Sequence, residues 1–404
     1  MSTSLLYHGF GIRGYKYVRS LHCRGTVTFG IRSDRFSLRC SECKGSELIL
    51  HGTTDREFRS IPIGSRPVFI ACPIPRVECL SCGVIRQVKV SFAEQRRTYT
   101  HAFKRYVLEI SQYMTISDVA RHLKVGWDLI KDIQKRYLTN HFSRPKLNRL
   151  RLLAIDEISI GRNHRYLTVV LDLRSGAVVF VGDGKGADAL KPFWRRLARF
   201  KSNIQAVAID MSPAYISAIQ ENLPDAAIVF DHFHIVKMFN DKLSDLRRTL
   251  QREAESEKTH TVLKGTRWLL LKNPDNLREH TNERQRLEAA LEINKPLAAA
   301  YYLKEDLRQL WTQSNKTTAD AFLQAWVKRA RASEIKQIEE MANTLETHKK
   351  GVLAYYDYRI STGPLEGTNN KIKTLQRQAY GYRDMDFFKL KIHALHLTKY
   401  ALTG

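Results

Sequence analysis

The stretch that decides the fold begins at residue 152 and reads Leu152-Leu-Ala-Ile-Asp156-Glu. It is a short, strongly apolar run that ends on an acidic residue, the pattern of a buried strand that carries a carboxylate to the edge of a sheet. The pattern recurs in Val207-Ala-Ile-Asp210-Met, and a third apolar run ends at Asp231. Acids at the ends of neighbouring strands can project into one crevice, where two hard oxygen ligands suit Mg²⁺. The alternative for each is an ordinary turn acid after a strand.

Short apolar runs alternate with helical patterns on both sides of this stretch. Strands interleaved with helices indicate an α/β sheet, and the first three strands are close enough in sequence to form an antiparallel meander. The predicted strands are 152–155, 166–171, 177–181, 204–209 and 226–230, and the predicted helices are 188–200 and 215–222. Residues 236–355 are almost entirely helical and highly charged in pattern, and 364–400 predicts one or two further helices.

A third candidate carboxylate lies in Ser361-Thr-Gly-Pro-Leu-Glu366-Gly-Thr-Asn-Asn-Lys-Ile-Lys. Gly363 as cap and Pro364 as first helical residue predict a helix start. One face of that helix then carries a carboxylate, an amide and two cations, which suit a metal site that continues into a track for phosphate groups. The four side chains are Glu366, Asn370, Lys373 and Arg377. The alternative for Glu366 is a capping glutamate that satisfies amides of its own helix.

All six cysteines lie in the first 95 residues. Four of them form two C-x₂-C pairs, Cys40 with Cys43 and Cys79 with Cys82, separated by the 35 residues 44–78. Two such pairs can converge on a tetrahedral Zn²⁺, and four thiolates make that zinc structural because no position remains for water. The alternative is four unrelated buried thiols. Cys23 and Cys72 lack such a partner and are expected to be small buried side chains.

Residues 115–137 have the pattern of a helix-turn-helix. Ser117 is the expected cap of the first helix, Val125-Gly126 makes the turn, and the second helix runs over 127–137. That second helix would enter a major groove, and its cations would meet phosphates. Its basic side chains are Lys131, Lys135 and Arg136. The alternative is an ordinary helical hairpin with a solvated basic face.

The charge balance points to an anionic partner. Lys and Arg number 66 against 41 Asp and Glu, a net charge of +25, and residues 1–150 carry 26 of the basic and 11 of the acidic side chains. Nucleic acid is the commonest partner for such an excess. Anionic phospholipid ranks far below it, because no basic amphipathic helix stands out. No apolar run approaches the roughly 18 residues of a membrane span, and the first 25 residues lack the apolar core of a secretory signal.

The order of these motifs resembles the DDE-type transposases of bacterial insertion sequences, in the ISL-three family. The resemblance covers nearly the whole chain, from the paired cysteines to the last helix, but residues 1–38 match nothing in the family's pattern. It is carried by Leu153-Ala-Ile-Asp156-Glu, Val207-Ala-Ile-Asp210-Met-Ser-Pro-Ala-Tyr, Asp231-His-Phe-His-Ile-Val-Lys, Gly265-Thr-Arg-Trp-Leu-Leu-Leu-Lys-Asn-Pro and Gly363-Pro-Leu-Glu366-Gly-Thr-Asn-Asn-Lys-Ile-Lys.

The resemblance assigns roles to several of these residues. It implies that Asp156, Asp210 and Glu366 are the catalytic, metal-binding triad of a ribonuclease H-like fold. It also implies that Asp231 and His234, the family's Asp-x-x-His element, lie beside the metal ligands or contact DNA. Trp268 falls where related insertion domains can present an aromatic ring to an unstacked base; the alternative is a core tryptophan beside Leu269–Leu271.

The implied fold is a multidomain α+β protein. Its parts are a zinc-binding domain at 1–95, a helix-turn-helix domain at 96–145, a ribonuclease H-like α/β catalytic domain in two parts (146–240 and 353–404), and an all-helical insertion at 241–352. The implied cofactors are two Mg²⁺ or Mn²⁺ ions per active site and structural Zn²⁺. The implied partners are double-stranded DNA, both as terminal inverted repeats and as target, and a second copy in a homodimer on DNA. The expected location is the bacterial cytoplasm, at the nucleoid.

The function implied in this way is that of a transposase, which binds the inverted repeats of its element, hydrolyses a phosphodiester at the element end and joins the freed 3′-hydroxyl to target DNA. Two other classes stay open. One is a non-catalytic zinc and helix-turn-helix regulator of DNA, and the other is a metal-dependent, structure-selective nuclease that cuts without joining. A serine or tyrosine recombinase would cut without metal, so resistance to chelators would reveal it.

Overall fold

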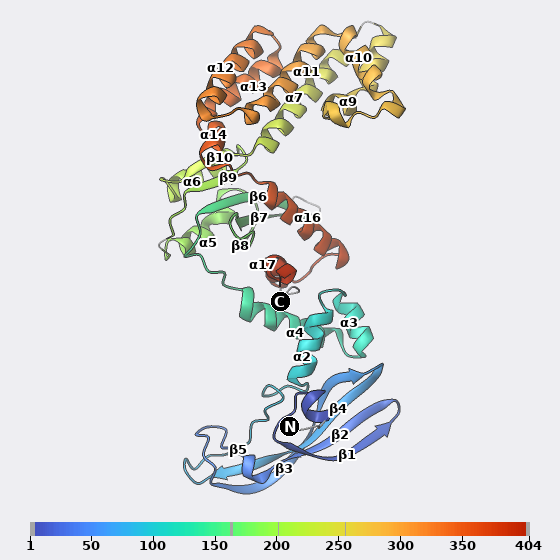
Figure 1. The fold of residues 1–404 in the computed structure, drawn as a ribbon, viewed down its shortest axis with the longest axis vertical. Coiled ribbons are helices and arrows are strands. Elements are labelled where there is room, and N and C mark those ends of the chain that lie inside the picture. Colours follow the sequence, from blue (N-terminus) through green and yellow to red (C-terminus); the bar gives the residue numbers. More distant parts are fainter. Residues whose placement is uncertain (1–4, 162–164, 201, 255, 401–404) are drawn as a thin grey trace. The chain divides into compact units, whose positions relative to one another are not determined.

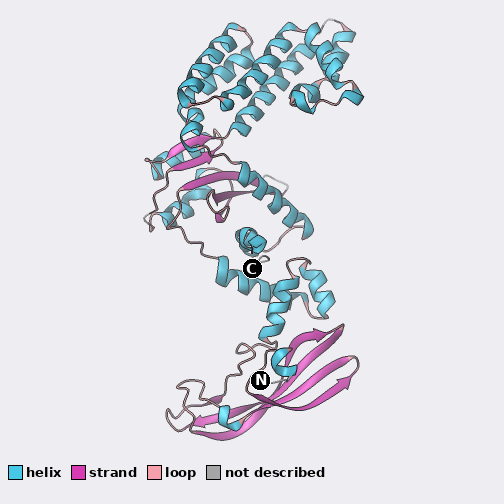
Figure 2. Ribbon diagram, in the orientation of Figure 1, coloured by secondary structure: helices cyan, strands magenta, loops and turns pink. Residues whose placement is uncertain are grey.

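The computed structural model describes residues 5–161, 165–200, 202–254 and 256–400 of the 404-residue chain. The chain folds into two compact units, Met1–His141 and Phe142–Gly404, which are called unit 1 and unit 2 here (Figure 1). Unit 1 combines a β-sheet with the helices that follow it, and unit 2 combines a second sheet with a long helical segment (Figure 2).

The sheet of unit 1 has the strand order β1-β2-β4-β3, and β5 pairs with β4. Strands β2 and β4 run parallel, and the other pairs are antiparallel. Side chains of β4 point alternately to the two faces, and the buried set, which includes Val68 and Ile70, packs with Leu6 and Phe10 in one apolar core. The bounds are α1 Leu5–His8, β1 Tyr15–Cys23, β2 Thr26–Ser33, η1 Arg35–Ser37, β3 Leu48–Ile63, β4 Arg66–Cys79 and β5 Ile85–Gln87.

The helix-turn-helix is present where the sequence predicts it, as α3 (Ile116–Leu123) and α4 (Trp127–Phe142), preceded by α2 (His101–Ile110). The expected cap was wrong by two residues, because Thr115 rather than Ser117 caps α3. Thr115 accepts a hydrogen bond from the Asp118 N–H at 3.2 Å and donates its hydroxyl to the Asp118 carboxylate at 2.6 Å. This reciprocal arrangement needs an acidic or amide side chain three residues after the cap, which Thr115 has and Ser117 lacks.

The sheet of unit 2 has the order β10-β9-β6-β7-β8. Strands β6, β7 and β8 form the predicted antiparallel meander, and β9 and β10 run parallel to β6. Each strand overlaps the apolar run that predicts it, because each run is long enough to cross the sheet and is bounded by turn residues. The bounds are β6 Leu152–Gly161, β7 Arg165–Asp172, β8 Val178–Asp183, β9 Ala206–Ile209 and β10 Ala227–Phe230.

Helices cover both faces of this sheet. Alternate residues of β6 face opposite sides, so Leu153 and Ile155 belong to the core formed with α5 (Ala187–Leu197) and α6 (Pro213–Asn222). Ala154 and Ile158 belong to the core formed with α16 (Gly363–Gln378) and α17 (Met385–Tyr400). The last two helices therefore return to the sheet after the long helical segment, and α16 lies beside β6 (Figure 1).

The segment between β10 and α16 is helical, as predicted, and the described residues from 232 to 362 contain no strand. Its core packs around side chains such as Phe239 and Trp326. Gly351 lies against the ring of Phe230, so that a side chain at position 351 would overlap the ring. The helices are α7 His232–Arg252, α8 Glu257–Gly265, α9 Arg267–Leu271, α10 Glu283–Ile293, α11 Lys295–Leu307, α12 Lys316–Ala332, α13 Lys336–Thr347, α14 Lys349–Leu353 and α15 Tyr355–Tyr358, with short 3₁₀ turns η2 Pro274–Asn276, η3 Glu279–Thr281 and η4 Arg308–Thr312. None of the described helices is long and apolar enough to cross a membrane.

Candidate functional site

Three carboxylates lie side by side across the parallel strands of unit 2. Ala154 of β6 pairs with Ala208 of β9, and Asp156 and Asp210 each follow two residues later along the chain. The pairing of β10 with β9 extends in the same way, because the Asp231 N–H donates to the Ile209 carbonyl at 3.0 Å. All three acids point to the α16 face of the sheet, since each lies an even number of residues from a side chain in that core.

Asp156, one of the two aspartates that the sequence predicts as metal ligands, is held by hydrogen bonds to both of its carboxylate oxygens. One carboxylate oxygen accepts from the Glu157 N–H at 2.8 Å, and the other accepts from the side-chain amide of Asn369 at 2.9 Å. Burial raises the pKa of Asp156, and the negative charge of Asp210 adds to the rise. Asp210 accepts a hydrogen bond from the Ser212 N–H at 3.1 Å. It therefore also stabilises the turn after β9, which was the alternative role considered for an acid at the end of a strand.

Asp231 is buried below this pair, with 2% of the residue exposed. Its Oδ2 accepts from the Thr362 hydroxyl at 2.6 Å and lies 3.2 Å from Nδ1 of His234. Burial alone would raise the pKa of Asp231, but hydrogen bonds from His234 and Thr362 bring that pKa below its usual value. The Asp231 carboxylate in turn raises the pKa of His234, and the nearby Asp156 supports the imidazolium. His234 therefore lies beside a buried carboxylate that favours its protonation, next to the two predicted metal ligands.

Glu366 lies in the first turn of α16 and is exposed. The helix begins one residue earlier than predicted, with Thr362 rather than Gly363 at the cap position. Asn369 follows Glu366 by three residues, so both lie on the same side of α16, and Asn369 reaches Asp156. In the described residues, Asp156, Asp210 and Glu366 do not form a closed group with donor atoms within 4.8 Å of one another.

Sequence reasoning missed Asn369 and selected its neighbour Asn370. Asn369 is buried and its Oδ1 has no hydrogen-bond partner in the described structure, whereas Asn370 is exposed. Lys373 and Arg377 are exposed with Asn370, as the helical periodicity predicts. The Asn-Asn pair was the available signal, but its two members lie about 100° apart around the helix, so the choice depends on which face of the helix packs against the sheet.

A second polar cluster lies on the other face of β6. The Tyr215 hydroxyl donates to Glu157 at 2.7 Å, and the Gly186 N–H donates to the same carboxylate oxygen at 3.1 Å. Burial raises the pKa of Tyr215. Glu157 therefore fixes the loop before α5 to the strand that carries Asp156.

The four paired cysteines of unit 1 converge. Their sulfur atoms lie within 4.8 Å of one another, with Cys40 and Cys82 at 3.7 Å and Cys43 and Cys79 at 3.4 Å. Backbone N–H groups of Glu42 and Cys43 lower the pKa of Cys40 to about 6, which favours the thiolate that binds metal. A Cβ at Gly45 would contact the sulfurs of Cys43 and Cys79 at 3.3 and 3.5 Å, so this glycine leaves room for the cluster.

The two remaining cysteines differ from each other. Cys72 is buried, as expected, and burial raises its pKa to about 11. The expectation for Cys23 was wrong, because Cys23 lies exposed at the end of β1. An edge strand that extends past the core cannot bury it.

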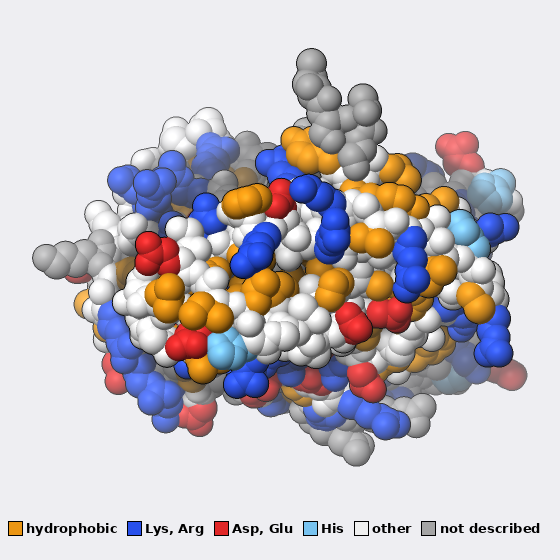
Figure 3. All heavy atoms as spheres, turned by 90° about the horizontal axis from the view of Figure 1, so that it is seen from below, with side chains coloured by type: hydrophobic (Ala, Val, Ile, Leu, Met, Phe, Trp, Pro, Cys, Tyr) orange, Lys and Arg blue, Asp and Glu red, His pale blue; other side chains and the backbone are white. Residues whose placement is uncertain are grey.

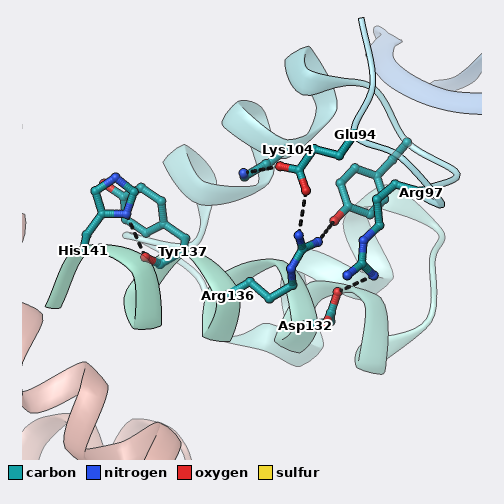
Figure 4. A network of polar contacts seen from close by, with 8 residues as sticks. Glu94, Arg97, Lys104, Asp132, Arg136, Tyr137 and His141 are labelled. Atoms are coloured by element: carbon teal, nitrogen blue, oxygen red, sulfur yellow. Dashed lines mark hydrogen bonds and ion pairs between the residues drawn. The ribbon is translucent and has the colours of Figure 1, made fainter. Parts of the chain in front are cut away.

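A salt-bridge network joins the helix-turn-helix to the segment before it (Figure 4). The Glu94 carboxylate accepts from Lys104 of α2 and Arg136 of α4, each at 2.7 Å. These two cations lower the pKa of Glu94 to about 2. Arg136, a predicted phosphate contact, therefore has a partner within the unit, and Lys131 lies 5.2 Å from the ring centre of Trp127.

Trp268 is exposed, with 67% of its surface accessible, while Leu269 and Leu270 beside it are buried. The structure therefore excludes the alternative of a core tryptophan. The Arg267 guanidinium lies over the ring at 4.8 Å from its centre.

Family models match both units. A transposase model of the DDE type, ISL3, covers residues 153–392, and the model of the helix-turn-helix domain of transposase family ISL3 covers residues 88–138. The chain belongs to the ISL3 family of DDE transposases. The transposase is thus an enzyme that acts on DNA, it uses divalent metal, and its helix-turn-helix is a DNA-binding domain.

Similar proteins have the same function in their names. The transposase for insertion sequence element IS1001 of Bordetella parapertussis is 32% identical over 372 residues, which cover 91% of each chain. The transposase for insertion sequence element IS1557 of Mycobacterium tuberculosis is 29% identical over 370 residues, or 85% of this chain and 82% of that one. Among solved structures, the Drosophila P element transposase strand transfer complex aligns with a TM-score of 0.41 at 11% identity, over 76% of this chain and 93% of that chain, a likeness too distant to carry an argument.

Proposed function

We propose that this transposase binds the terminal inverted repeats of an insertion sequence, cleaves a DNA strand at each element end and transfers the freed 3′ end to target DNA. The observation that carries the proposal is the pair Asp156 and Asp210 on neighbouring parallel strands, beneath the helix that bears Glu366. Asp156, Asp210 and Glu366 are the proposed catalytic residues and the ligands of two Mg²⁺ or Mn²⁺ ions.

The chemistry of these donors fits a divalent ion. Burial and the negative charge of Asp210 raise the pKa of Asp156, and a hard cation bound between the two carboxylates would relieve that repulsion. A buried Oδ1 on Asp231 and another on Asn369 have no hydrogen-bond partner in the described structure, which leaves oxygen atoms available near the same strands. The metal, when bound, would activate a water or hydroxyl nucleophile and stabilise charge on the phosphate that is attacked.

The other side chains have distinct proposed tasks. Asn369 holds Asp156 with a hydrogen bond and so fixes its free lone pairs toward Asp210. Asp231 favours the protonated form of His234, and a protonated His234 would in turn support the ionised form of the nearby Asp156. The exposed row Asn370, Lys373 and Arg377 would bind the DNA backbone beyond Glu366.

The paired cysteines and the helix-turn-helix complete the proposal. Cys40, Cys43, Cys79 and Cys82 would hold a structural Zn²⁺ within a zinc-binding domain at 1–95. Lys131, Lys135 and Arg136 in the domain at 96–145 would contact the inverted repeat, and Trp268 would stack on an unpaired base within the insertion at 241–352. The catalytic domain would then comprise 146–240 and 353–404. Because two element ends must be joined, the working form would be a homodimer on DNA.

The test is cleavage of labelled element-end DNA with Mg²⁺ or Mn²⁺. Asp210→Asn should lose metal-dependent nicking and keep DNA binding, while the matched control Asp225→Asn, an exposed aspartate of the same sheet region, should cut like wild type. Equal cutting by wild type and Asp210→Asn would remove Asp210 from the site. Cutting without joining to a target plasmid would favour the nuclease, and binding without any cutting would favour the regulator.

A further inference from the structure

The hairpin formed by β1 and β2 extends from the edge of the unit 1 sheet. The two strands pair from Tyr15 opposite Ser33 to Cys23 opposite Thr26. Between them lies a two-residue turn, Arg24-Gly25, in which both residues have positive φ, 46° and 75°. Two such residues make the turn type whose twist matches a two-stranded ribbon. Strand β1 is the last strand of the sheet, and among the strands that the structure describes none pairs with its outer edge (Figure 1).

The hairpin arm, defined as residues 15–33, is held to the sheet through β2, which pairs with β4 and buries Val27 and Ile31, whereas β1 contributes little to the core. In β1 every residue after Tyr15 is exposed, on both faces of the strand. The exposed fractions of its largest apolar side chains are 55% for Tyr17, 53% for Val18 and 49% for Leu21. Strands in folded proteins normally bury one face, and a long exposed edge is a hazard for aggregation unless charge or a partner covers it. The arm therefore has the form of a surface that a partner covers.

The positive charge of residues 1–33 favours a polyanion as the partner that covers the arm. Residues 1–33 contain no Asp or Glu, and the basic side chains there are Arg13, Lys16, Arg19, Arg24 and Arg32. The first acidic residue is Asp34, which pairs with Lys16 at 3.3 Å. Within the described residues no ion pair engages Arg19 or Arg24. A second copy of the arm would bring like charges together at this edge, whereas a polyanion would neutralise them.

A basic cavity adjoins the base of the arm. It measures about 400 Å³ and is lined by cationic side chains, several serines and no carboxylate. The cationic residues are Arg13, Arg39, Lys44 and Lys89. In Figure 3, basic side chains are interspersed with apolar and some acidic ones over the surface. The positive surface thus extends from the arm to the neighbourhood of the paired cysteines.

We propose that the hairpin arm is a second DNA-contacting element of the transposase, separate from the helix-turn-helix. The exposed strand β1 and the turn at Arg24-Gly25 would lie along the DNA backbone, where Arg19 and Arg24 would contact phosphates, while β2 anchors them to β4. Tyr17 and Leu21 would pack against the sugar–phosphate edge and lose their exposure to water. The proposal assigns a role to the part of the chain that lies outside the family's recognisable motifs, and it rests on the proposed function in one respect, namely that DNA is the substrate.

The test compares the salt dependence of DNA binding by the full-length, zinc-loaded protein on a duplex of random sequence. Each phosphate contact contributes about 0.9 to the slope of log K against log salt, so Arg19→Gln/Arg24→Gln should lower the slope by about 1.8. Between 50 and 200 mM salt, wild type should then lose about twelvefold more affinity than this variant. Arg19→Lys/Arg24→Lys should keep the wild-type slope, because charge rather than shape sets it. The matched control Arg174→Gln/Arg195→Gln, which removes two exposed arginines of unit 2, should also keep it.

Three other outcomes would overturn the inference. An unchanged slope in the Gln variant, with wild type binding DNA normally, would show that the arm does not touch DNA. A changed sedimentation coefficient with an unchanged slope would make a second copy of the chain the partner instead. An equal loss in the Lys variant would show that the charge of these two side chains does not set the slope, which the inference requires. Failure of the proposed function would look different from these outcomes. In that case the wild-type protein itself would not bind DNA or would not cut it.

Discussion

Replacing Glu94 with glutamine should loosen the helix-turn-helix while every basic side chain stays in place. Glu94 bridges Lys104 of α2 and Arg136 of α4, and the three side chains are 27%, 25% and 35% exposed. The network lowers the pKa of Glu94 from 4.5 to about 2, which sets a ceiling of about 3 kcal/mol on its contribution to stability. Partial exposure screens the pair with solvent, so we expect about 1–2 kcal/mol.

The assay is hydrogen exchange of the full-length protein at neutral pH, followed in peptides from α2 and α4. A loss of about 1–2 kcal/mol raises the population of the open form roughly 5- to 30-fold. Glu109→Gln is the matched control, because Glu109 is an exposed glutamate of α2, the helix to which Lys104 belongs. Exchange in Glu94→Gln that matches exchange in Glu109→Gln would refute the reasoning.

The pH dependence of the same pair has a definite sign. A carboxyl whose pKa is lowered by folding stabilises the folded state above its unfolded pKa and loses that contribution as the pH falls through the folded value. Glu94 should therefore stabilise unit 1 fully above about pH 4.5, and the contribution should disappear toward about pH 2. The Glu94→Gln protein should lack this part of the acid transition.

Three further predictions concern the two candidate metal sites. Cys43→Ser should abolish stoichiometric zinc in the purified protein, measured by elemental analysis, and Cys23→Ser should leave it unchanged. Asn369→Ala should lower metal-dependent cleavage roughly 10- to 100-fold at unchanged DNA binding, because it removes the donor that orients Asp156. His234 should titrate above its usual pKa in the wild type and return toward it in Asp231→Asn, so its stabilising charge is present at low pH and is lost as pH rises through the raised value.

Each of these three has an outcome that contradicts it. Full zinc content in Cys43→Ser would remove that thiolate from the cluster. For Asn369→Ala the control is Asn370→Ala, whose side chain is exposed, and equal cleavage by both would refute the orienting role. An imidazole resonance of His234 that titrates identically in wild type and Asp231→Asn would show that the carboxylate does not support the charge.

The sequence predicts the architecture of unit 2 well because its signals are local. Runs such as 166–171 and 204–209 are apolar except for Thr168 and Gln205 and are bounded by turn residues, so they predict buried strands without knowledge of their neighbours. The strand order and the closeness of Asp156 to Asp210 depend on the pairing of β6 with β9, which lie about 50 residues apart in the chain. Periodicity contains no information about such pairing, and the prediction that these acids meet came from the general behaviour of parallel strands.

What the sequence cannot supply is the phase of a helix against its neighbours. Successive residues of α16 lie about 100° apart around the helix axis. A choice that is wrong by one residue therefore exchanges the buried Asn369 for the exposed Asn370. The exposure of Trp268 has the same origin, since two buried leucines follow it directly and only the packing of α9 decides which of the three faces water. The cap of α3 was mispredicted because Thr115 and Ser117 are both residue types that commonly cap helices. The two differ only in the residue three positions later, which is Asp118 for Thr115 and Ala120 for Ser117.

The return of α16 to the sheet links the proposed site to distant parts of the chain. Thr362, at the start of the helix, donates to Asp231, and Asn369, two turns along, donates to Asp156. These bonds join residues 131 and 213 positions apart in sequence. Since both acceptors are carboxylates, any change in the charge around Asp156 or Asp231 acts on the position of the helix that carries Glu366. The helical segment between β10 and α16 takes part in the same arrangement, because its first helix, α7, carries His234, which lies 3.2 Å from the Asp231 carboxylate.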